Sequence, residues 1–494
     1  MNSKLLLAAV ITIGVGAVLR FVNLNSLPVF VDESIYVRWS QVMQAESSLR
    51  FLPLSDGKQP LYMWTLMPLL RFFSDPLIAG RVLSAVTGLG TILGVGIAAY
   101  LLFKSTRAGV VSAAIYATVP YAVFFDRMAL ADGMLTMWLV WTFVFVYLAI
   151  RHLRFDAAML AGFCLGFAWL TKSPAIFGFG LVPAMLLLAE PKKIWRAAVI
   201  LVPTLVIAFG MYNILRLGPE FHMIAIRNKD YIYPIAEILT HPRDPLLPHL
   251  RDVVQFYVYL ATPIGLLLAV WGIFSGQWEH WRNRAVLAFW WLAPVIVQSA
   301  IAKTLTARYL LFTLPFMVIL ATHAIEHIGE KTKKRRLAWA MAGLFVLFGL
   351  GEAIVLIANP AAVPLPRIER AGYLEQWTAG TGLKEASQYI REAAQTGPVI
   401  VGSEGFFGTP FSALQMYLND VPQVRVIGVG VWIDKVSPDL IKATVENQVF
   451  LVVNSSRFHI AKPEKEKLTL IASYPKAVSP SGEVEYLLLF KLEK

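Results

Sequence analysis

Two adjacent carboxylates, Asp32 and Glu33, follow the first apolar stretch of this sequence, within the segment Leu27–Tyr36. Residues 4–22 can cross a bilayer, and charged residues recur from there to Pro60, so the chain leaves the membrane before this pair. Carboxylates beside a bilayer are costly and are candidates for function. The structural alternative is that Asp32 is the N-cap of a helix from Ser34 onward.

Four more charged residues lie at the ends of apolar stretches. Asp132 opens one stretch, Lys172 ends another, Arg308 opens a third together with Tyr309, and Lys58 precedes a short apolar segment. A Lys or Arg here can simply extend to the lipid head groups, and Asp132 can cap a helix. Acids and bases gathered on one face would form a charged cavity that could hold a phosphate and activate a hydroxyl.

The composition places these residues in a polytopic membrane protein. The 494 residues are 57% hydrophobic and only 15% charged, whereas soluble domains carry roughly 25% charged residues. The net charge of +12 comes from Lys and Arg in short loops, which indicates orientation in the membrane and not nucleic-acid binding. The single cysteine, Cys164, excludes an intrachain disulfide and a cysteine-based metal site.

Apolar stretches of spanning length number about eleven. They lie near residues 4–22, 82–103, 108–125, 132–150, 157–171, 174–190, 195–215, 252–274, 285–302, 308–326 and 337–358. Every second loop is rich in Lys and Arg, which predicts a cytoplasmic N-terminus and an extracytoplasmic C-terminus. The outer face then carries the loops 23–81 and 216–251. This predicts a multi-pass protein of the plasma membrane whose candidate site faces outward.

The segment 61–73 is apolar but too short to span, and we interpret it as an interfacial or re-entrant helix with Tyr62 and Trp64 at the interface. Residues 1–358 thus form a membrane module. The composition changes after residue 359, where three prolines precede a water-soluble pattern. Helices are expected at 383–394 and 411–418, and strands at 399–401, 424–429, 449–453 and 486–492. Alternating helices and strands predict a small α/β domain over 359–494. No glycine-rich phosphate loop opens its helices, which argues against a nucleotide site.

In its order of short motifs, the chain resembles the GT-C glycosyltransferases that use polyprenyl-phosphate sugars, in the branch of the aminoarabinose transferases and protein O-mannosyltransferases. The resemblance covers roughly residues 1–330. The matching motifs are Asp32-Glu33 followed by Tyr36, Gly57-Lys-Gln-Pro-Leu-Tyr-Met-Trp64, Arg81-Val-Leu-Ser-Ala85, Arg127 to Thr136, Leu170-Thr-Lys172, and Ala307-Arg-Tyr-Leu-Leu311. Two positions depart from the pattern: Gln59 replaces a proline, and Ser173 replaces a glycine.

The resemblance implies a polyprenyl-phosphate sugar donor, together with a lipid, glycan or protein acceptor. The acceptor hydroxyl needs a base, for which Asp32 is the candidate. The leaving phosphate needs cations, for which Lys58, Lys172 and Arg308 are the candidates. Attack opposite the leaving phosphate implies inversion at the anomeric carbon.

Other residues of these motifs are assigned supporting roles. Asp132 assists the acceptor or orients a cation. The supporting residues are Glu33, Tyr36, Tyr62 and Tyr309. A divalent metal between Asp32, Glu33 and Asp132 is an open alternative, although no histidine stands at a clear ligand spacing.

Two other classes of protein compete with this interpretation. A transporter or lipid flippase would show ionisable residues near the bilayer midplane and paired repeats, whereas the charges here lie at the ends of the apolar stretches. A scaffold would place its function in the C-terminal domain, which shows no catalytic constellation and could bind an acceptor or a partner.

Overall fold

The computed structural model describes residues 3–276, 280–331 and 335–494 and divides the chain into two compact units. We call the first the helical unit; it comprises Met1–Leu24, Arg50–Tyr62 and Arg81–Pro366. We call the second the sheet unit; it comprises Asn25–Leu49, Met63–Gly80 and Arg367–Lys494. The sequence suggested a boundary at residue 359, with all of loop 23–81 in the membrane module. The division differs because two parts of that loop pack with the C-terminal residues.

The described residues include seven helices that are long and apolar enough to span a membrane, or nine if each of two bent pairs counts as one span. The single helices are α1 (Ser3–Phe21), α4 (Pro76–Phe103), α7 (Ala131–His152), α10 (Ile194–Tyr212), α15 (Trp281–Ile301), α16 (Leu314–Lys331) and α17 (Arg335–Ala358). The bent pairs are α5 (Thr106–Thr118) with α6 (Pro120–Asp126), and α13 (Leu246–Leu260) with α14 (Pro263–Phe274). Two shorter apolar segments, Phe155–Thr171 (α8) and Ser173–Leu188 (including α9, Gly178–Ala184), match the two remaining predicted stretches. The prediction of a polytopic helical protein is confirmed.

Proline explains both bends. The second helix of each pair begins at Pro120 or Pro263, and the axes turn by 60° and 113°. Proline lacks the amide proton that would continue the preceding helix, so the chain changes direction there.

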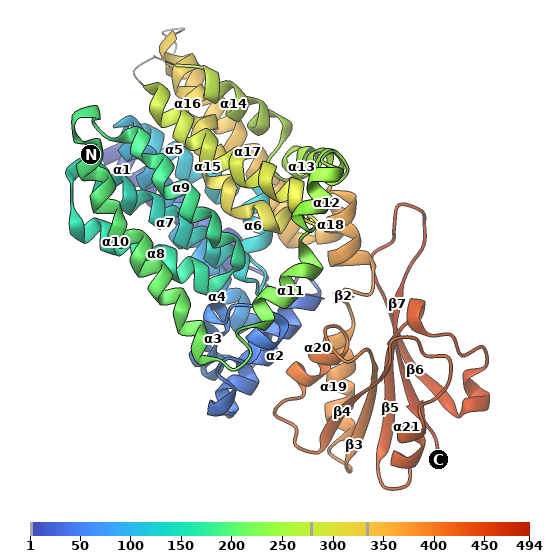
Figure 1. Cartoon of the computed structure of the whole chain (residues 1–494). Helices are drawn as coiled ribbons and strands as arrows, with labels where there is room; N and C mark the ends of the chain where they lie inside the picture. The colour runs from blue at the N-terminus through green and yellow to red at the C-terminus, as the bar shows by residue number, and fades with distance from the viewer. Residues whose placement is uncertain (1–2, 277–279, 332–334) are drawn as a thin grey trace. The chain divides into compact units, whose positions relative to one another are not determined.

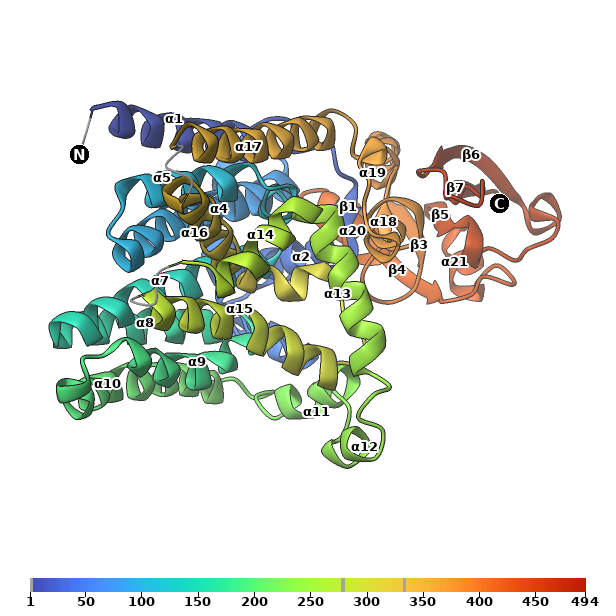
Figure 2. The same ribbon diagram turned by 90° about the horizontal axis from the view of Figure 1, so that it is seen from above.

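Close helix packing in the helical unit depends on small side chains. Helix α8 packs against both α7 and α10 (Figure 2). A Cβ atom on Gly162 of α8 would lie 3.1 Å from the Cα of Thr204 on α10, and the Thr204 hydroxyl donates to the carbonyl of Ala158 at 2.8 Å. Small residues with an occasional interhelical hydrogen bond are typical of membrane helices.

The short apolar segment forms helix α3 (Leu61–Leu69), followed by a 3₁₀ turn. The Tyr62 side chain faces the protein interior, where it is fully buried and its hydroxyl lies 2.9 Å from that of Ser84. A buried phenol satisfies its hydroxyl with an internal partner.

The sheet unit contains a five-stranded sheet in the order β4-β3-β5-β7-β6 (Figure 1). Strands β3 (Val399–Glu404), β4 (Val424–Gly430) and β5 (Gln448–Asn454) are parallel, and β7 (Tyr486–Leu492) and β6 (Leu468–Pro475) continue the sheet antiparallel. Helices α19 (Leu383–Ala393), α20 (Phe411–Tyr417) and α21 (Pro438–Ala443) connect the strands. The predicted α/β class is confirmed, while β6 and α21 were missed.

The segment 25–49, which follows α1, joins the sheet unit through backbone pairing. Strand β1 (Val29–Phe30) pairs antiparallel with β2 (Ala379–Gly380), and helix α2 (Val31–Ala45) packs on α20. The Gln41 amide donates to the carbonyl of Met416 at 3.0 Å, and the ring centroids of Phe30 and Tyr373 lie 4.4 Å apart. Helix α2, which carries Asp32, is therefore fixed on the C-terminal domain.

Candidate active site

The helical unit holds an ion pair between Asp132 and Lys172. Asp132 lies in the first turn of α7, where the helix dipole favours a carboxylate. Lys172 follows the end of α8 in an extended conformation, and its ammonium lies 2.6 Å from the Asp132 carboxylate. The Asp132 side chain is 2% exposed and that of Lys172 18%. The pair is thus open to solvent only on the lysine side.

Tyr309 brings a second cation to this pair. The 3₁₀ helix η9 (Ala307–Thr313) carries both Arg308 and Tyr309. The Lys172 ammonium lies 4.7 Å from the Tyr309 ring centroid, and the Arg308 guanidinium carbon lies 5.2 Å from it. Two of the three proposed phosphate-binding cations therefore flank one aromatic ring, and the carboxylate of Asp132 holds one of them.

Lys58 belongs to a separate ion-pair network. Its ammonium lies 2.5 Å from one carboxylate oxygen of Asp56, and the other oxygen accepts from Arg227 at 2.5 and 3.1 Å. Arg227 lies on α11 (Met223–Tyr231), within the segment 216–251. The network ties this segment to Lys58. Sequence reasoning missed Asp56 and Arg227; the Asp56-Gly57-Lys58 spacing was the available signal.

The two departures from the family pattern contact each other. The Gln59 side-chain amide donates to the Ser173 hydroxyl at 2.7 Å. Gln59 directly follows Lys58, and Ser173 directly follows Lys172. A proline and a glycine could not form this bond, because neither has a polar side chain. The bond therefore joins the loops that carry the two lysines.

The sheet unit carries the acidic pair Asp32 and Glu33. Phe30 is the N-cap of α2, so the alternative that Asp32 is the N-cap was wrong; Asp32 lies in the first turn and is half-buried. Glu33 is fully buried and accepts the Phe30 amide proton at 2.9 Å. Tyr36 is buried, with its ring stacked on Trp39 at 6.3 Å. Glu33 thus caps the helix, while Asp32 retains partial solvent access.

Two arginines, Arg81 and Arg127, belong to the motifs that carry the family resemblance and cap helix α1. Arg127 donates to the carbonyls of Leu19, Val22 and Asn23 at 2.7–2.8 Å. Arg81 donates to the carbonyl of Leu24. The last carbonyls of a helix have no partner within the helix, and in a membrane protein they need another donor. These residues therefore fix the point where the chain leaves α1 toward the Asp32 segment.

The open metal alternative involves Asp32 and Glu33 of the sheet unit and Asp132 of the helical unit. No group of three or more His, Cys, Asp or Glu side chains placed to hold a metal ion occurs among the residues that the structure describes. Glu33 caps a helix and Asp132 pairs with Lys172. Within the helical unit, the structure brings Asp132, Lys172, Arg308 and Tyr309 together and links Lys58 to them through Gln59 and Ser173.

Part of the chain matches a known protein family. Residues 57–214 match the family described as dolichyl-phosphate-mannose-protein mannosyltransferase. This segment includes Lys58, Asp132 and Lys172 but neither Asp32 nor Arg308. No curated protein matches the chain significantly.

Solved structures share the fold over nearly the whole chain. ArnT from Cupriavidus metallidurans in the apo state matches with a TM-score of 0.58 and 13% identity, over 98% of this chain and 97% of ArnT. The same protein bound to undecaprenyl phosphate matches with a TM-score of 0.57 and 16% identity, over the same shares of the two chains. AglB from Archaeoglobus fulgidus, an oligosaccharyltransferase solved with an inhibitory peptide and a dolichol-phosphate, matches with a TM-score of 0.55 and 13% identity, over 98% of this chain and 74% of AglB. At this identity the likeness establishes the fold.

Proposed function

We propose that this chain, which has the GT-C glycosyltransferase fold, is a membrane enzyme that transfers a sugar from a polyprenyl-phosphate donor to an acceptor. The observation that carries the proposal is the cluster of Asp132, Lys172, Tyr309 and Arg308. Phosphates leave with developing negative charge, which preorganised cations stabilise most effectively where water is scarce. ArnT and AglB, the similar proteins, have been solved with undecaprenyl phosphate and dolichol-phosphate respectively.

In this proposal Lys172 and Arg308 bind the donor phosphate, and Asp132 holds Lys172 in position. The hydrogen bond from Lys172 uses one carboxylate oxygen of Asp132, and the Tyr309 ring keeps the ammonium close to Arg308. Lys58 is the third cation, oriented by Asp56. The two carboxylates Asp56 and Asp132 offset part of the charge of the cations Lys58, Lys172, Arg227 and Arg308. The positive charge that remains favours binding of a phosphate.

Asp32 is the proposed general base. It is the member of the acidic pair that retains solvent access, since Glu33 is committed to the α2 cap. Removing a proton from an acceptor hydroxyl as the phosphate leaves the opposite face of the sugar would invert the anomeric carbon. Replacing Asp32 with Asn should lower transfer by about 10²–10⁴-fold. Near wild-type transfer by this variant would eliminate Asp32 as the base and make Asp132 the next residue to test.

The proposed reaction takes place on the extracytoplasmic face. Lys and Arg are concentrated in the alternate loops, which by the positive-inside rule are cytoplasmic. The C-terminal domain then lies outside the cytoplasm. A reporter that works only in the cytoplasm, fused after Lys494, should be inactive, and an active reporter would reverse the proposed orientation.

The function is tested by incubating the purified protein, reconstituted in lipid nanodiscs, with a panel of radiolabelled polyprenyl-phosphate sugars and total membrane acceptors. The expected result is transfer of label from one donor of the panel, with release of the polyprenyl phosphate. Absence of transfer from every donor, with the Asp32→Asn variant indistinguishable from wild type, would refute the proposal.

A further inference from the structure

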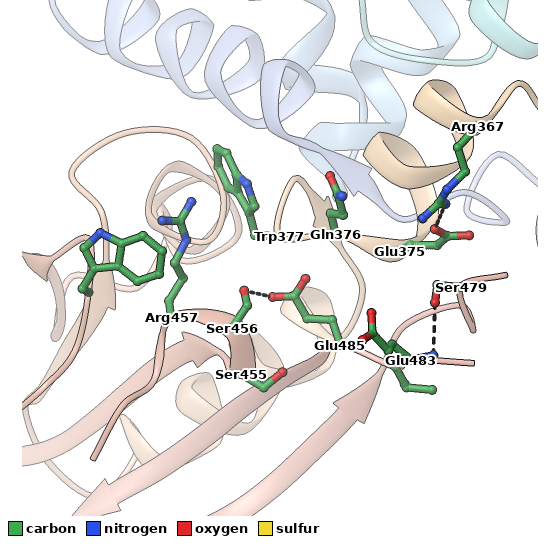
Figure 3. Close-up of a pocket in the computed structure, with 12 residues that line it drawn as sticks. Arg367, Glu375, Gln376, Trp377, Ser455, Ser456, Arg457, Ser479, Glu483 and Glu485 are labelled. Carbon is green, nitrogen blue, oxygen red and sulfur yellow. Dashed lines mark hydrogen bonds and ion pairs between the residues drawn. The ribbon is translucent and has the colours of Figure 1, made fainter. Parts of the chain in front are cut away.

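The sheet unit holds a cavity of about 560 Å³ that the proposed chemistry does not use (Figure 3). Its walls include Trp432, which follows β4, and Ser455 to Arg457, which follow β5. The chain passes from β3 to β4 and then returns to place β5 on the other side of β3. In parallel sheets, ligands bind at the carboxyl ends of the strands where the strand order reverses in this way.

Arg457 lies between two tryptophans at this edge. Its guanidinium carbon is 4.3 Å from the ring centroid of Trp432 and 5.2 Å from that of Trp377. Stacking holds a guanidinium by its faces and leaves its N–H donors in the plane available. Trp432 also stacks on the His459 ring, yet it is 54% exposed, so part of its indole presents apolar surface to solvent. The cavity therefore combines aromatic surface with fixed hydrogen-bond donors.

Carboxylates and hydroxyls supply acceptors in the same cavity. Glu485 accepts a hydrogen bond from the Ser456 hydroxyl, which fixes one of its oxygens (Figure 3). Glu375 is held by Arg367 and by Arg370, whose Nε lies 2.7 Å from it. These contacts lock the polar groups before any ligand arrives, as a preorganised site requires.

A buried hydrogen-bond network adjoins the cavity at Gln376. Lys476 is buried and donates to the carbonyl of Gln376 at 2.9 Å and to the Asn454 side chain at 2.6 Å. Asn454 in turn donates to Glu404 from its backbone at 2.6 Å and from its side chain at 2.7 Å. This network connects the ends of the adjacent parallel strands β3 and β5.

The mixture of carboxylates, arginines and tryptophans in the cavity indicates which class of ligand fits it. The carboxylates disfavour a phosphate or another anion, and the arginines disfavour a cation. A sugar is neutral, presents vicinal hydroxyls that both donate and accept, and has C–H faces that pack on indole. We propose that this cavity is a carbohydrate-binding site that takes a hexose unit of a glycan. Its role as the place where a glycan acceptor is held rests on the proposed transferase function.

The test uses the full-length protein in lipid nanodiscs, because sugar-headed detergents would compete for the site. Saturation-transfer NMR and calorimetry with glucose, galactose, mannose, N-acetylglucosamine and their short oligosaccharides should detect saturable binding of at least one sugar. Trp432→Ala and Arg457→Ala should each weaken that binding at least about tenfold. Arg425→Ala, an exposed arginine on β4 away from the cavity, should leave it within twofold.

The outcomes separate this inference from the proposed function. Absence of binding to every sugar, equal binding by wild type and Arg457→Ala, or saturable binding of inorganic phosphate in place of sugar would overturn the carbohydrate site. Glu485→Gln provides a second variant, since it keeps the shape and should also lose at least about tenfold in affinity. Sugar transfer without sugar binding would refute only the cavity, and sugar binding without transfer would refute only the enzyme.

Discussion

Asp126 and Asp132 both belong to carboxylate–cation pairs of the helical unit, yet the pairs differ in their access to water. Arg20 and Asp126 lie 2.8 Å apart with both side chains 0% exposed, and Arg20 also donates to the carbonyl of Ala117 at 2.9 Å. Lys172, by contrast, keeps 18% of its side chain exposed beside Tyr309. We call Arg20–Asp126 the closed pair; it joins helix α1 to helices α5 and α6. We call Asp132–Lys172 the open pair, because its exposed side can meet a ligand.

The surroundings of the closed pair explain why it is inert. A Cβ atom on Gly88 of α4 would lie 2.5 Å from an Asp126 oxygen and 2.7 Å from the Arg20 Nε, so α4 passes directly over the pair. No space remains for a substrate group. The comparison therefore suggests that partial exposure of one partner, and not ion pairing itself, distinguishes a candidate site from a structural contact in this unit.

The largest expected effect is the loss of the closed pair. Asp126→Ala leaves a charged arginine buried without its carboxylate, which should cost about 3–5 kcal/mol of stability. Thermal unfolding in nanodiscs measures the loss. The double variant Arg20→Met with Asp126→Leu removes both charges and should be more stable than Asp126→Ala. Equal melting of Asp126→Ala and wild type would show that this pair does not hold the fold.

Disrupting the open pair should affect activity and spare stability. Asp132→Asn removes the charge that positions Lys172, and misplacing such a group should lower turnover by about 10–100-fold. The matched control is Glu326→Gln, because Glu326 pairs with Arg107 at 2.5 Å with side-chain exposures of 14% and 19%. Activity is measured with the active donor. Equal losses of activity in Asp132→Asn and Glu326→Gln would mean that the Asp132–Lys172 pair has no specific role in the reaction.

The Asp56 network should have a smaller effect. Arg227→Ala removes one partner of Asp56 but leaves Lys58 paired, so the KM for the donor should rise only a few-fold, with kcat nearly unchanged. The control is Arg243→Ala, which changes an exposed arginine of the same segment, 216–251. If the Arg227→Ala substitution also lowers kcat, Arg227 takes part in the chemical step.

The last prediction concerns Glu404, a buried carboxylate of the sheet unit. Burial raises the pKa of Glu404 from its ordinary 4.5 to about 7, against opposing contributions from Asn454, Lys476 and Arg457. Between these values the folded domain holds a proton that the unfolded chain releases, so stability should fall as pH rises from 5 to 7. Hydrogen exchange of β3 and β5, corrected for intrinsic rates, should show this decline. Glu404→Gln should abolish it, and an unchanged slope would assign the decline to another group.

The apolar spans and the open pair could be predicted because both depend on local sequence properties, namely hydropathy and charge. Hydropathy marks the ends of spans and alternating charge assigns their side, so Asp132 and Lys172 could be placed on one face before their contact was known. The bends are also encoded locally, at Pro120 and Pro263. The positions of helix ends are local information.

The closed pair and the sheet-unit pairing were not predictable because their partners are distant in sequence. Arg20 and Asp126 are 106 residues apart and both lie in or beside apolar stretches, where periodicity says nothing about partners. Strand β1 has two residues and pairs with β2 near residue 380, so no local pattern reveals it. Strand β6 is largely exposed and therefore lacks the apolar alternation of a core strand.

The most direct test of the proposed site measures binding of a radiolabelled polyprenyl phosphate to the full-length protein in nanodiscs. The double variant Lys172→Ala with Arg308→Ala removes both cations beside Tyr309, and the single variants remove one each. Partial losses of affinity are expected for the single variants and near-complete loss for the double variant, with unchanged melting. Wild-type affinity in the folded double variant would contradict the assignment and locate the phosphate elsewhere.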